Sequence, residues 1–437
     1  MTNELLQQVR ILDPVSGTDQ LADVLITDGI IKAVAPKIAE WSSDTVVRDC
    51  QGLILGTGLV DLYSHSGEPG YEERETWTSL LTAAAAGGFT RLAILPDTVP
   101  PLDNPSGLAR VRQQERSHPS HSSPHLYYWG AITQGVEGQQ MTELAELAAA
   151  GVVGFADGRP LSNLALLRRV LEYLHPLPIP VALWACDPKL KGNGVMREGA
   201  NSIRFGIPGN PAMSESAALS AILEVVSAIA TPVHLMRIST RRGVELIQAA
   251  KARGVPVTAS TSWMHLLLDT QDVSNYNPNL RLDPPLGNPE DRIALIEGIR
   301  DGVIDAIAID HTPYTYEEKT VAFAEAPPGV IGLELALPLL WQNLVDTGVC
   351  SALQLWQTIS TNPAFCLGQS PAKIANEQPA ELVLFDPQQG WTVAQDTLKS
   401  LSRNTPWFGQ KVRGRTVQTW SGQGKQGKQG KQGKQGK

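Results

Sequence analysis

The sequence has 437 residues, of which 42% are hydrophobic and 18% are charged, and these values exclude a disordered or fibrous chain. The formal net charge is -8, and five of the lysines stand in the last sixteen residues, so the rest of the chain is still more acidic. This negative charge excludes nucleic acid as the main partner, because nucleic acid is a polyanion and binds to basic protein surfaces.

Cysteine usage and hydropathy bear on the cellular compartment. The four cysteines, Cys50, Cys186, Cys350 and Cys366, are far apart and form no CxxC pair, which is typical of buried thiols in a reducing compartment. The first residues show no signal-peptide pattern, and no apolar run approaches the length that a bilayer requires. We therefore expect a cytoplasmic protein without membrane attachment.

The two ends of the chain share one pattern. Residues 1–57 alternate apolar and polar residues in short runs such as "ADVLITDGIIKAVAP", which are separated by Asp-Pro, Ser-Gly and Asp-Gly turns. Residues 371–421 repeat this pattern in "PAELVLFDP" and "KVRGRTVQTW". We interpret the two segments as the N-terminal and C-terminal parts of one small β-sandwich.

Residues 58–370 have a different organisation. Strand-like apolar runs, such as "TRLAILPD" and "IDAIAID", alternate with helical stretches such as "ESAALSAILEVVSAIA". Repeated strand-then-helix units predict a parallel sheet and, at this length, a (β/α)8 barrel.

The C-terminal tail, residues 422–437, is a glycine-lysine-glutamine triplet repeat. It has no apolar residue to bury, so we expect it to be disordered.

The candidate site follows from the predicted barrel, because chemistry in this fold takes place where strands end on the carboxyl-terminal face. A hydrolytic zinc site there needs several neutral histidines and carboxylates that converge on the ion. The strand ends supply, in chain order, Tyr63, His65, Asp97, Asp157, Trp184, Asp187, His234, Arg237, Met264, His265, Asp310, His311 and Tyr314.

Few of these residues suit a metal. His65, Asp157 and Asp310 are plausible ligands, whereas Trp184 is not, and Arg237 opposes a metal because a fixed cation beside a dication costs energy. Each ligand also has a simpler interpretation, with His65 as a hydrogen-bonded core histidine and the two aspartates as turn residues. Arg237 could instead pair with one or both aspartates and fill a vacated metal position.

Several long stretches resemble one known family. "GLVDLYSHSGEPGYEERETWTSLLTAAAAGGFT", "GIPGNPAMSESAAL" and "NPNLRLDPPLGNPEDRIALIEGIRDGVIDAIAIDHTPYTYEEK" are similar, in this order, to dihydroorotases of the cyclic amidohydrolase superfamily. The resemblance runs from about residue 10 to residue 420. It implies an amidohydrolase-type barrel with a composite β-sandwich, and a two-metal hydrolysis of a cyclic amide in which an aspartate moves the proton.

The resemblance also implies that the metal site has decayed. The family's metal-binding histidines fall on Tyr63, Trp184 and Arg237, and only His65 is retained among the histidines compared. Three metal candidates remain, namely His65, Asp157 and Asp310. Asp157 corresponds to one of two adjacent aspartates in the family, and Asp310 corresponds to its catalytic aspartate.

The substrate positions that the resemblance implies are altered as well. Arginines of the family fall on Gly67 and Gly287, asparagines on Asp97 and Asp283, and a histidine on Tyr314. Dihydroorotate is an anion, so these replacements remove attractive charge and add repulsive charge.

The leading hypothesis is a non-catalytic dihydroorotase-like protein of pyrimidine synthesis that acts as a structural partner of aspartate carbamoyltransferase. It requires no cofactor, and we expect a homo-oligomer. The alternative is a metal-dependent hydrolase of cyclic amides or imides with a reduced zinc site made of His65, Asp157 and Asp310. A true dihydroorotase with unusual ligands is the third possibility, which the substitution of a histidine by Arg237 disfavours.

Overall fold

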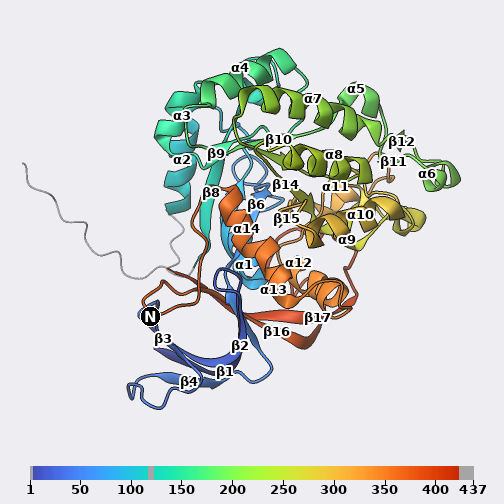
Figure 1. Ribbon diagram of the computed structural model, residues 1–437. Helices are drawn as coiled ribbons and strands as arrows, with labels where there is room; N and C mark the ends of the chain where they lie inside the picture. The colour runs from blue at the N-terminus through green and yellow to red at the C-terminus, as the bar shows by residue number, and fades with distance from the viewer. Residues whose placement is uncertain (1–2, 117–122, 423–437) are drawn as a thin grey trace, which may run out of the picture.

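The computed structural model describes residues 3–116 and 123–422 and shows a barrel with a β-domain attached at one end (Figure 1). The triplet-repeat tail, expected to be disordered, lies outside the described residues apart from Gly422. No helix within the described ranges is both long and apolar enough to cross a membrane.

The β-domain is one seven-stranded sheet to which both ends of the chain contribute, which confirms the composite domain. The order is β17-β16-β5-β1-β2-β3, and β4 pairs with β1. Its strands are β1 (Glu4–Asp13), β2 (Thr18–Thr27), β3 (Ile30–Ala35), β4 (Val46–Asp49), β5 (Ile54–Thr57), β16 (Glu381–Thr392) and β17 (Lys411–Ser421). The two ends meet where β16 runs antiparallel to β5. Alternating apolar residues of these strands form their own core, which includes Leu6, Val24 and Leu382.

The barrel is confirmed by eight strands in the order β15-β14-β13-β10-β9-β8-β7-β6. They are β6 (Leu59–Ser64), β7 (Phe89–Ile94), β8 (His125–Gly130), β9 (Gly154–Phe155), β10 (Val181–Trp184), β13 (Val233–Met236), β14 (Val257–Ser262) and β15 (Ala306–Ala308). The seven pairings between neighbouring strands of this sheet are all parallel. Polar contacts join the last strand to the first, since the Ile309 amide donates to Asp61 Oδ1 and the His65 amide donates to the His311 carbonyl.

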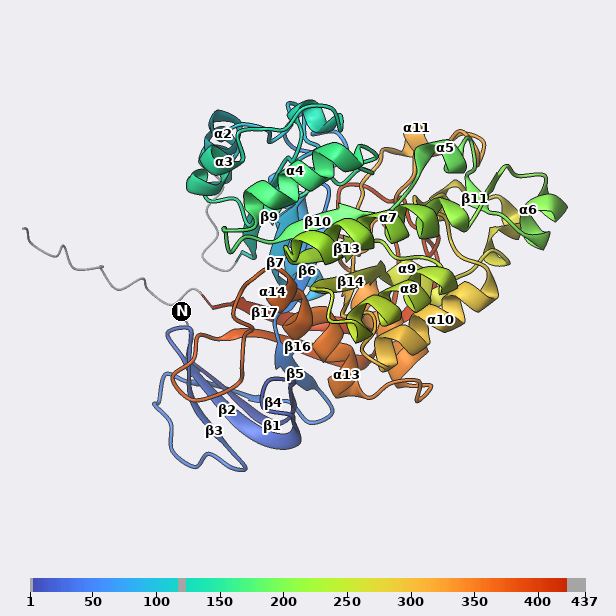
Figure 2. The ribbon, with the colours of Figure 1, turned by 45° about the horizontal axis from the view of Figure 1, so that its top comes forward.

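Helices surround the strands, as the two ribbon views show (Figure 2). The longer ones cover the barrel between successive strands and bury an apolar face, as α4 does with Leu167 and Leu171. The helices are α1 (Trp77–Gly87), α2 (Pro105–Arg116), α3 (Leu144–Ala150), α4 (Leu164–Leu174), α5 (Pro188–Lys191), α6 (Ala200–Phe205), α7 (Met213–Ile229), α8 (Arg241–Ala252), α9 (Trp263–Leu267), α10 (Pro289–Arg300), α11 (Tyr316–Lys319), α12 (Ala336–Leu340), α13 (Ala352–Trp356) and α14 (Asn362–Cys366). Short helical turns are η1 (Gln134–Val136), η2 (Asp272–Asn275), η3 (Pro278–Leu280), η4 (Trp341–Val345) and η5 (Gln357–Thr361), and a small ribbon pairs β11 (Met196–Arg197) with β12 (Gly209–Asn210).

The β-domain and the barrel are joined by buried polar contacts. Arg91 of β7 forms a two-pronged ion pair with Glu381 of β16, with both contacts at 2.6 Å. Trp356 Nε1 donates to the carbonyl of Thr57 at 2.9 Å. The indole lies so close to β5 that a Cβ atom at Gly56 would come within 2.1 Å of it, so only glycine fits there. These contacts fix the domains against each other.

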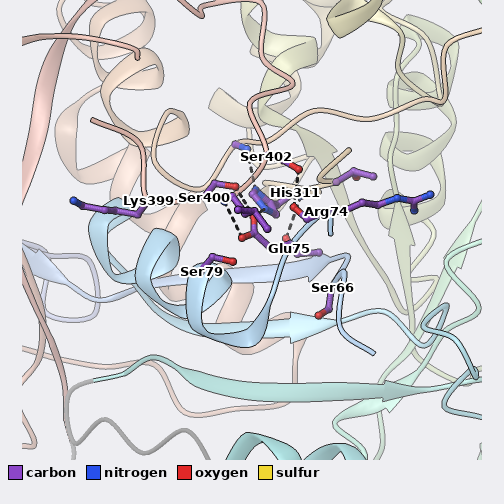
Figure 3. Close-up of polar contacts among 12 residues, drawn as sticks. Ser66, Arg74, Glu75, Ser79, His311, Lys399, Ser400 and Ser402 are labelled. Carbon is purple, nitrogen blue, oxygen red and sulfur yellow. Dashed lines mark hydrogen bonds and ion pairs between the residues drawn. The ribbon is translucent and has the colours of Figure 1, made fainter. Parts of the chain in front are cut away.

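The segment between β16 and β17 also reaches the barrel, where a buried acid holds it (Figure 3). Glu75 accepts a hydrogen bond from the Leu401 amide at 3.0 Å and another from the Ser400 hydroxyl. The other neighbour of Glu75 is His311, whose Nε2 lies 3.4 Å from the carboxylate. The Ser402 hydroxyl donates to the carbonyl of Arg74 at 2.7 Å. Because His311 follows Asp310, this cluster anchors a strand end that belongs to the barrel mouth.

Candidate functional site

A cavity of about 340 Å³ opens at the carboxyl ends of the barrel strands. Of the residues that the sequence places in the site, the cavity is lined by His65, Gly67, Asp97, Trp184, Arg237, Asp283, Asp310 and Tyr314. Three of the metal and substrate positions that the resemblance implies do not line it, namely Tyr63, Asp157 and Gly287, and neither do the strand-end residues Asp187, His234, Met264 and His311. The strand ends therefore converge as the barrel topology requires, but not every predicted side chain faces the cavity.

The centre of the mouth is an ion pair between Arg237, which is buried, and Asp310, which is partly buried. Arg237 Nε and Nη2 donate to the two carboxylate oxygens of Asp310 at 2.8 and 2.7 Å, which is the bidentate geometry of a guanidinium and a carboxylate. Burial alone would raise the pKa of Asp310, but Arg237 outweighs this effect and lowers it far below the usual range. Asp310 is therefore ionised at every physiological pH.

Both members of this pair have a left-handed backbone. The φ angle is 56° at Arg237 and 52° at Asp310. A residue with a side chain loses about 1–2 kcal/mol in this conformation. This conformational cost arises at both residues, and the surrounding contacts must offset it at each of them. The backbone at both members of the pair is therefore fixed by packing and hydrogen bonds.

Of the three residues at positions where the resemblance implies histidines, Arg237 contacts the other two. The guanidinium of Arg237 lies 4.9 Å from the ring centre of Trp184 and 5.6 Å from that of Tyr63. The Arg237 amide donates to the Tyr63 hydroxyl at 3.1 Å, and this hydroxyl is also 2.9 Å from Ser260 Oγ. Tyr63 thus lies beneath the cavity floor and supports the arginine from below.

His65 is held between two carboxylates. Its Nδ1 is 2.8 Å from Asp97 Oδ2, whereas its Nε2 is 3.6 Å from Asp310 Oδ1 and 3.2 Å from Arg237 Nη2. Burial alone would lower the pKa of His65, but the two carboxylates raise it to about 9. The separation from Asp310 exceeds a hydrogen bond, so we attribute the higher pKa mainly to Asp97.

Asp157 does not take part in this cluster. Its carboxylate accepts hydrogen bonds from the Ile132 amide at 2.8 Å and from the amide and hydroxyl of Thr133 at 3.0 and 2.6 Å. Arg237 instead donates to the carbonyl of Gly158 at 2.8 Å. The expected pairing of the arginine with an aspartate therefore involves Asp310 alone. Asp157 is satisfied within the loop that follows β8.

The predicted substrate positions are engaged in other contacts. A Cβ atom at Gly67 would lie 2.4 Å from the Glu75 carbonyl oxygen, so an arginine cannot be placed there without moving the loop. Asp283 forms an ion pair with Lys191. Gly287 packs against Asp291, outside the cavity, and a Cβ atom there would lie 2.6 Å from the Asp291 Cβ.

Of two further residues that the sequence predicts at the mouth, Tyr314 lines the cavity and Met264 does not. The ring of Tyr314 lines the cavity and lies 4.9 Å from the guanidinium of Arg74. Arg74 in turn is paired with Glu318. Met264 is buried in the core, and its neighbour His265 lines the cavity instead.

Several charged residues of the mouth were missed by the sequence interpretation. Arg159 lines the cavity two residues after Asp157, and Arg74 lines it from the loop after β6. Lys191 reaches Asp283 from α5. Arg159 directly follows a strand-ending Asp-Gly pair, which was a usable signal. Arg74 and Lys191 lie outside the strand ends, where no spacing rule points to them.

The described residues contain no group of three or more histidine, cysteine, aspartate or glutamate side chains arranged to hold a metal ion. His65 and Asp310 come nearest, but the guanidinium of Arg237 contacts both of them. The donors that remain at the mouth are thus already engaged with a cation.

Comparison with known proteins identifies the family. Residues 130–434 match the amidohydrolase family. The chain is 45% identical to a probable dihydroorotase-like protein of Synechocystis sp., covering 95% of this chain and 99% of that protein. It is 38% identical to a dihydroorotase of Pelobacter propionicus, covering 95% and 97%.

Solved structures show the same fold. An L-hydantoinase (dihydropyrimidinase) from Arthrobacter aurescens superposes with a TM-score of 0.82 at 21% identity, covering 97% of this chain and 96% of that one. At this identity the likeness establishes the barrel with its β-domain and nothing further. The sequence relatives carry the finer assignment, and the chain belongs to the dihydroorotase family of amidohydrolases.

Proposed function

We propose that this protein is a non-catalytic dihydroorotase-like protein whose barrel mouth is held together by an ion pair in place of a metal centre. The observation that carries the proposal is the bidentate contact between Arg237 and Asp310. A hydrolytic zinc site needs three or four neutral or anionic donors and an open position for water. Here Asp310, the aspartate that would move the proton, is paired with the guanidinium of Arg237, which is always charged.

The remaining donors do not fit a dication. A metal next to His65 and Asp310 would sit within a few ångström of the Arg237 guanidinium, and two such cations repel each other strongly in a partly buried site. Asp157 could join only by giving up three hydrogen bonds. The reduced zinc site of the alternative hypothesis therefore lacks one of its three ligands in this conformation.

The electrostatic balance supports the same proposal. His65 and Arg237 face Asp97 and Asp310, so both carboxylates have nitrogen partners without any ion. Buried carboxylates without a cation would take up protons, whereas the pKa values of both aspartates are lowered. The site is thus electrically complete as it stands.

We extend the proposal to a partner, aspartate carbamoyltransferase, which the family resemblance implies. This partner is supported by a contrast within the protein. The residues of the barrel mouth differ from those that the family resemblance implies, whereas the contacts that hold the barrel and the β-domain together are present. The ion pair of Arg91 with Glu381 and the buried contacts of Glu75 keep the barrel and β-domain rigid, as a structural subunit requires. A homo-oligomeric state of the protein belongs to the same proposal.

Replacing Arg237 by methionine should destabilise the protein by about 3–5 kcal/mol, because it leaves Asp310 as an unpaired buried charge. Urea unfolding measures this effect. The double variant Arg237→Met/Asp310→Asn should recover most of the loss, since both charges are then absent. A matched control is Arg168→Ala, which breaks an exposed pair with Glu172 and should cost less than about 1 kcal/mol. A cost below that of the control would contradict the buried ion pair.

The contribution of His65 to stability should fall as the pH rises from 6.5 to 9. The pKa of His65 in the folded protein, about 9, exceeds its ordinary value of 6.5. Its stabilising contribution is therefore complete below pH 6.5 and is lost as the pH passes 9. The loss is at most roughly 3 kcal/mol. Urea unfolding at both pH values should show a greater loss in the wild type than in Asp97→Asn, and a greater loss in Asp97→Asn than in His65→Gln, which reports the groups other than His65. An equal change in the free energy of unfolding between the two pH values in all three proteins would exclude this role of His65.

The purified protein should contain less than stoichiometric zinc and should not hydrolyse dihydroorotate above the level of an Asp310→Ala control, even with added zinc or manganese. Without a metal no water is activated, and Gly67 supplies no cation for the substrate. Elemental analysis and a hydrolysis assay measure the two properties. Arg237→His should not gain zinc and turnover together, because Tyr63 and Trp184 still occupy two ligand positions. Tightly held zinc with turnover in the wild type would overturn the proposed function.

Aspartate carbamoyltransferase from the same organism should form a complex with this protein at micromolar concentrations. Size-exclusion chromatography with light scattering should show one species heavier than either protein alone, and the separate runs give the oligomeric state of each. Two unshifted peaks in the mixture would rule out the partner without affecting the expectation on zinc.

A further inference from the structure

We infer that two copies of this protein associate face to face through the amino-terminal end of the barrel, where Phe365 of each copy enters an apolar hollow of the other. This contact deepens the homo-oligomeric state that belongs to the proposed function, and it rests on that part of the proposal alone. It lies at the end of the barrel opposite to the mouth.

The hollow lies where three neighbouring strands begin. It has a volume of about 470 Å³ and is lined by Val181, Val233 and Val257, which are the first residues of β10, β13 and β14. The same residues pair across the strands, Val181 with Val233 and Val233 with Val257. Parallel strands that start in register place their first residues along one edge, so the hollow opens at the amino-terminal end of the barrel.

A proline precedes each of these valines, in the sequences "IPV", "TPV" and "VPV". Pro180, Pro232 and Pro256 therefore follow one another along the edge, and all three line the hollow. Proline has no amide hydrogen, so this edge lacks the donors that strand starts otherwise expose. The carbonyls of Pro180 and Pro256 accept hydrogen bonds from the amides of Phe155 and Val233 at 2.9 and 3.1 Å. The edge thus presents pyrrolidine rings in place of polar backbone groups.

The polar side chains of the hollow are paired with one another or with the barrel interior. Thr258 Oγ1 lies 2.9 Å from His234 Nδ1, and His234 Nε2 lies 2.8 Å from Ser260 Oγ. Cys366 makes a side-chain hydrogen bond with Thr258. Among the described residues that line the hollow there is no aspartate, glutamate, lysine or arginine. Such a surface is complementary to an apolar side chain and not to a charged or polar ligand.

An exposed aromatic side chain stands next to this hollow. Phe365 belongs to α14 and lines the hollow, but it is 60% exposed and therefore leaves the hollow unfilled. An exposed phenylalanine is stabilised when a contact removes its ring from water. One face of the protein thus carries both a projecting ring and a hollow that accepts such a ring.

A second copy of the chain supplies the matching features. In a two-fold pair every contact is made twice, so the ring of each copy can enter the hollow of the other. A different protein would need a ring and a hollow of its own at the same spacing.

The charge of the protein supports the same occupant. Each copy has a formal net charge of -8, so two acidic surfaces repel each other, whereas the uncharged hollow brings no like charges together. The tail of residues 422–437 consists of glycine, lysine and glutamine, and it provides no apolar group for the hollow.

Light scattering of the full-length protein after size-exclusion chromatography tests this contact. The wild type should be a dimer or a multiple of one at micromolar concentration. Phe365→Glu should halve that mass and weaken the association roughly hundredfold or more, because it would bury two glutamates in the contact. Phe408→Glu is the matched control. Phe408 is 45% exposed on the segment between β16 and β17, and its replacement should leave the mass unchanged.

A mixture of two further variants shows whether the contact joins two copies. Phe365→Ala removes the ring and keeps the hollow, whereas Pro232→Glu keeps the ring and places a charge in the hollow. Each variant alone should have half the wild-type mass. Their mixture should regain the association in part, since the ring of the Pro232→Glu copy can enter the hollow of the Phe365→Ala copy. Both positions are exposed, so the fold should persist, and urea unfolding of each variant verifies this.

The possible results separate this inference from the proposed function. A monomeric wild type overturns the inference together with the homo-oligomeric state, and it leaves the metal-free, inactive mouth as proposed. An oligomer that keeps its mass in Phe365→Glu, or a mixture of variants that stays dissociated, overturns the inference alone. If Phe365→Glu abolishes a complex with aspartate carbamoyltransferase and leaves the homo-oligomer unchanged, the hollow belongs to that partner and the inference is likewise overturned.

Discussion

A carboxylate buried at the end of a barrel strand needs a cation, and this requirement determines the arrangement of the mouth. In this protein the cation is the guanidinium of Arg237, which satisfies both oxygens of Asp310. A buried ion pair survives only when its remaining donors are also satisfied. The third contact, from Nη1 to the Gly158 carbonyl, and the aromatic face of Trp184 meet this condition. The two left-handed backbone conformations are maintained by the same contacts.

The barrel interior continues this pattern of satisfied polar groups. The Tyr63 hydroxyl accepts from the Arg237 amide, and this leaves its own proton for Ser260 Oγ. Ser260 is 2.8 Å from His234 Nε2, and His234 Nδ1 is 2.9 Å from Thr258 Oγ1. Burial lowers the pKa of His234 to about 3, so the ring is neutral. A chain of neutral hydrogen bonds thus runs from the mouth into the barrel and leaves none of these groups unpaired.

The interactions that hold the fold involve other residues than those that changed at the mouth. Arg91 and Glu381 join the barrel to the β-domain, and Trp356 packs over Gly56, neither of which lines the cavity. Glu75 binds the segment between β16 and β17 through backbone and hydroxyl donors. None of these contacts depends on a metal. Substitutions at the mouth can therefore accumulate without loss of the scaffold, which is the condition for a structural role.

The sequence by itself determined the architecture and several of the residues that meet at the mouth. Alternation of strands and helices predicts a parallel barrel, and the carboxyl ends of parallel strands must converge on one face. This rule placed His65, Trp184, Arg237 and Asp310 together correctly. It also indicated that a cation next to buried acids would pair with one of them, because an unpaired buried charge is too costly.

Only the tertiary structure decided how each side chain is used. Asp157 lies two residues beyond the end of β9, yet its carboxylate turns to the amides of Ile132 and Thr133, which come from a neighbouring loop. The close packing of Gly67 against the Glu75 carbonyl and the position of Arg159 at the rim depend on loop conformations. Strand ends are fixed by the periodic pattern of the barrel, whereas loops and side-chain orientations are fixed by contacts between residues far apart in the sequence, and no local pattern encodes these contacts.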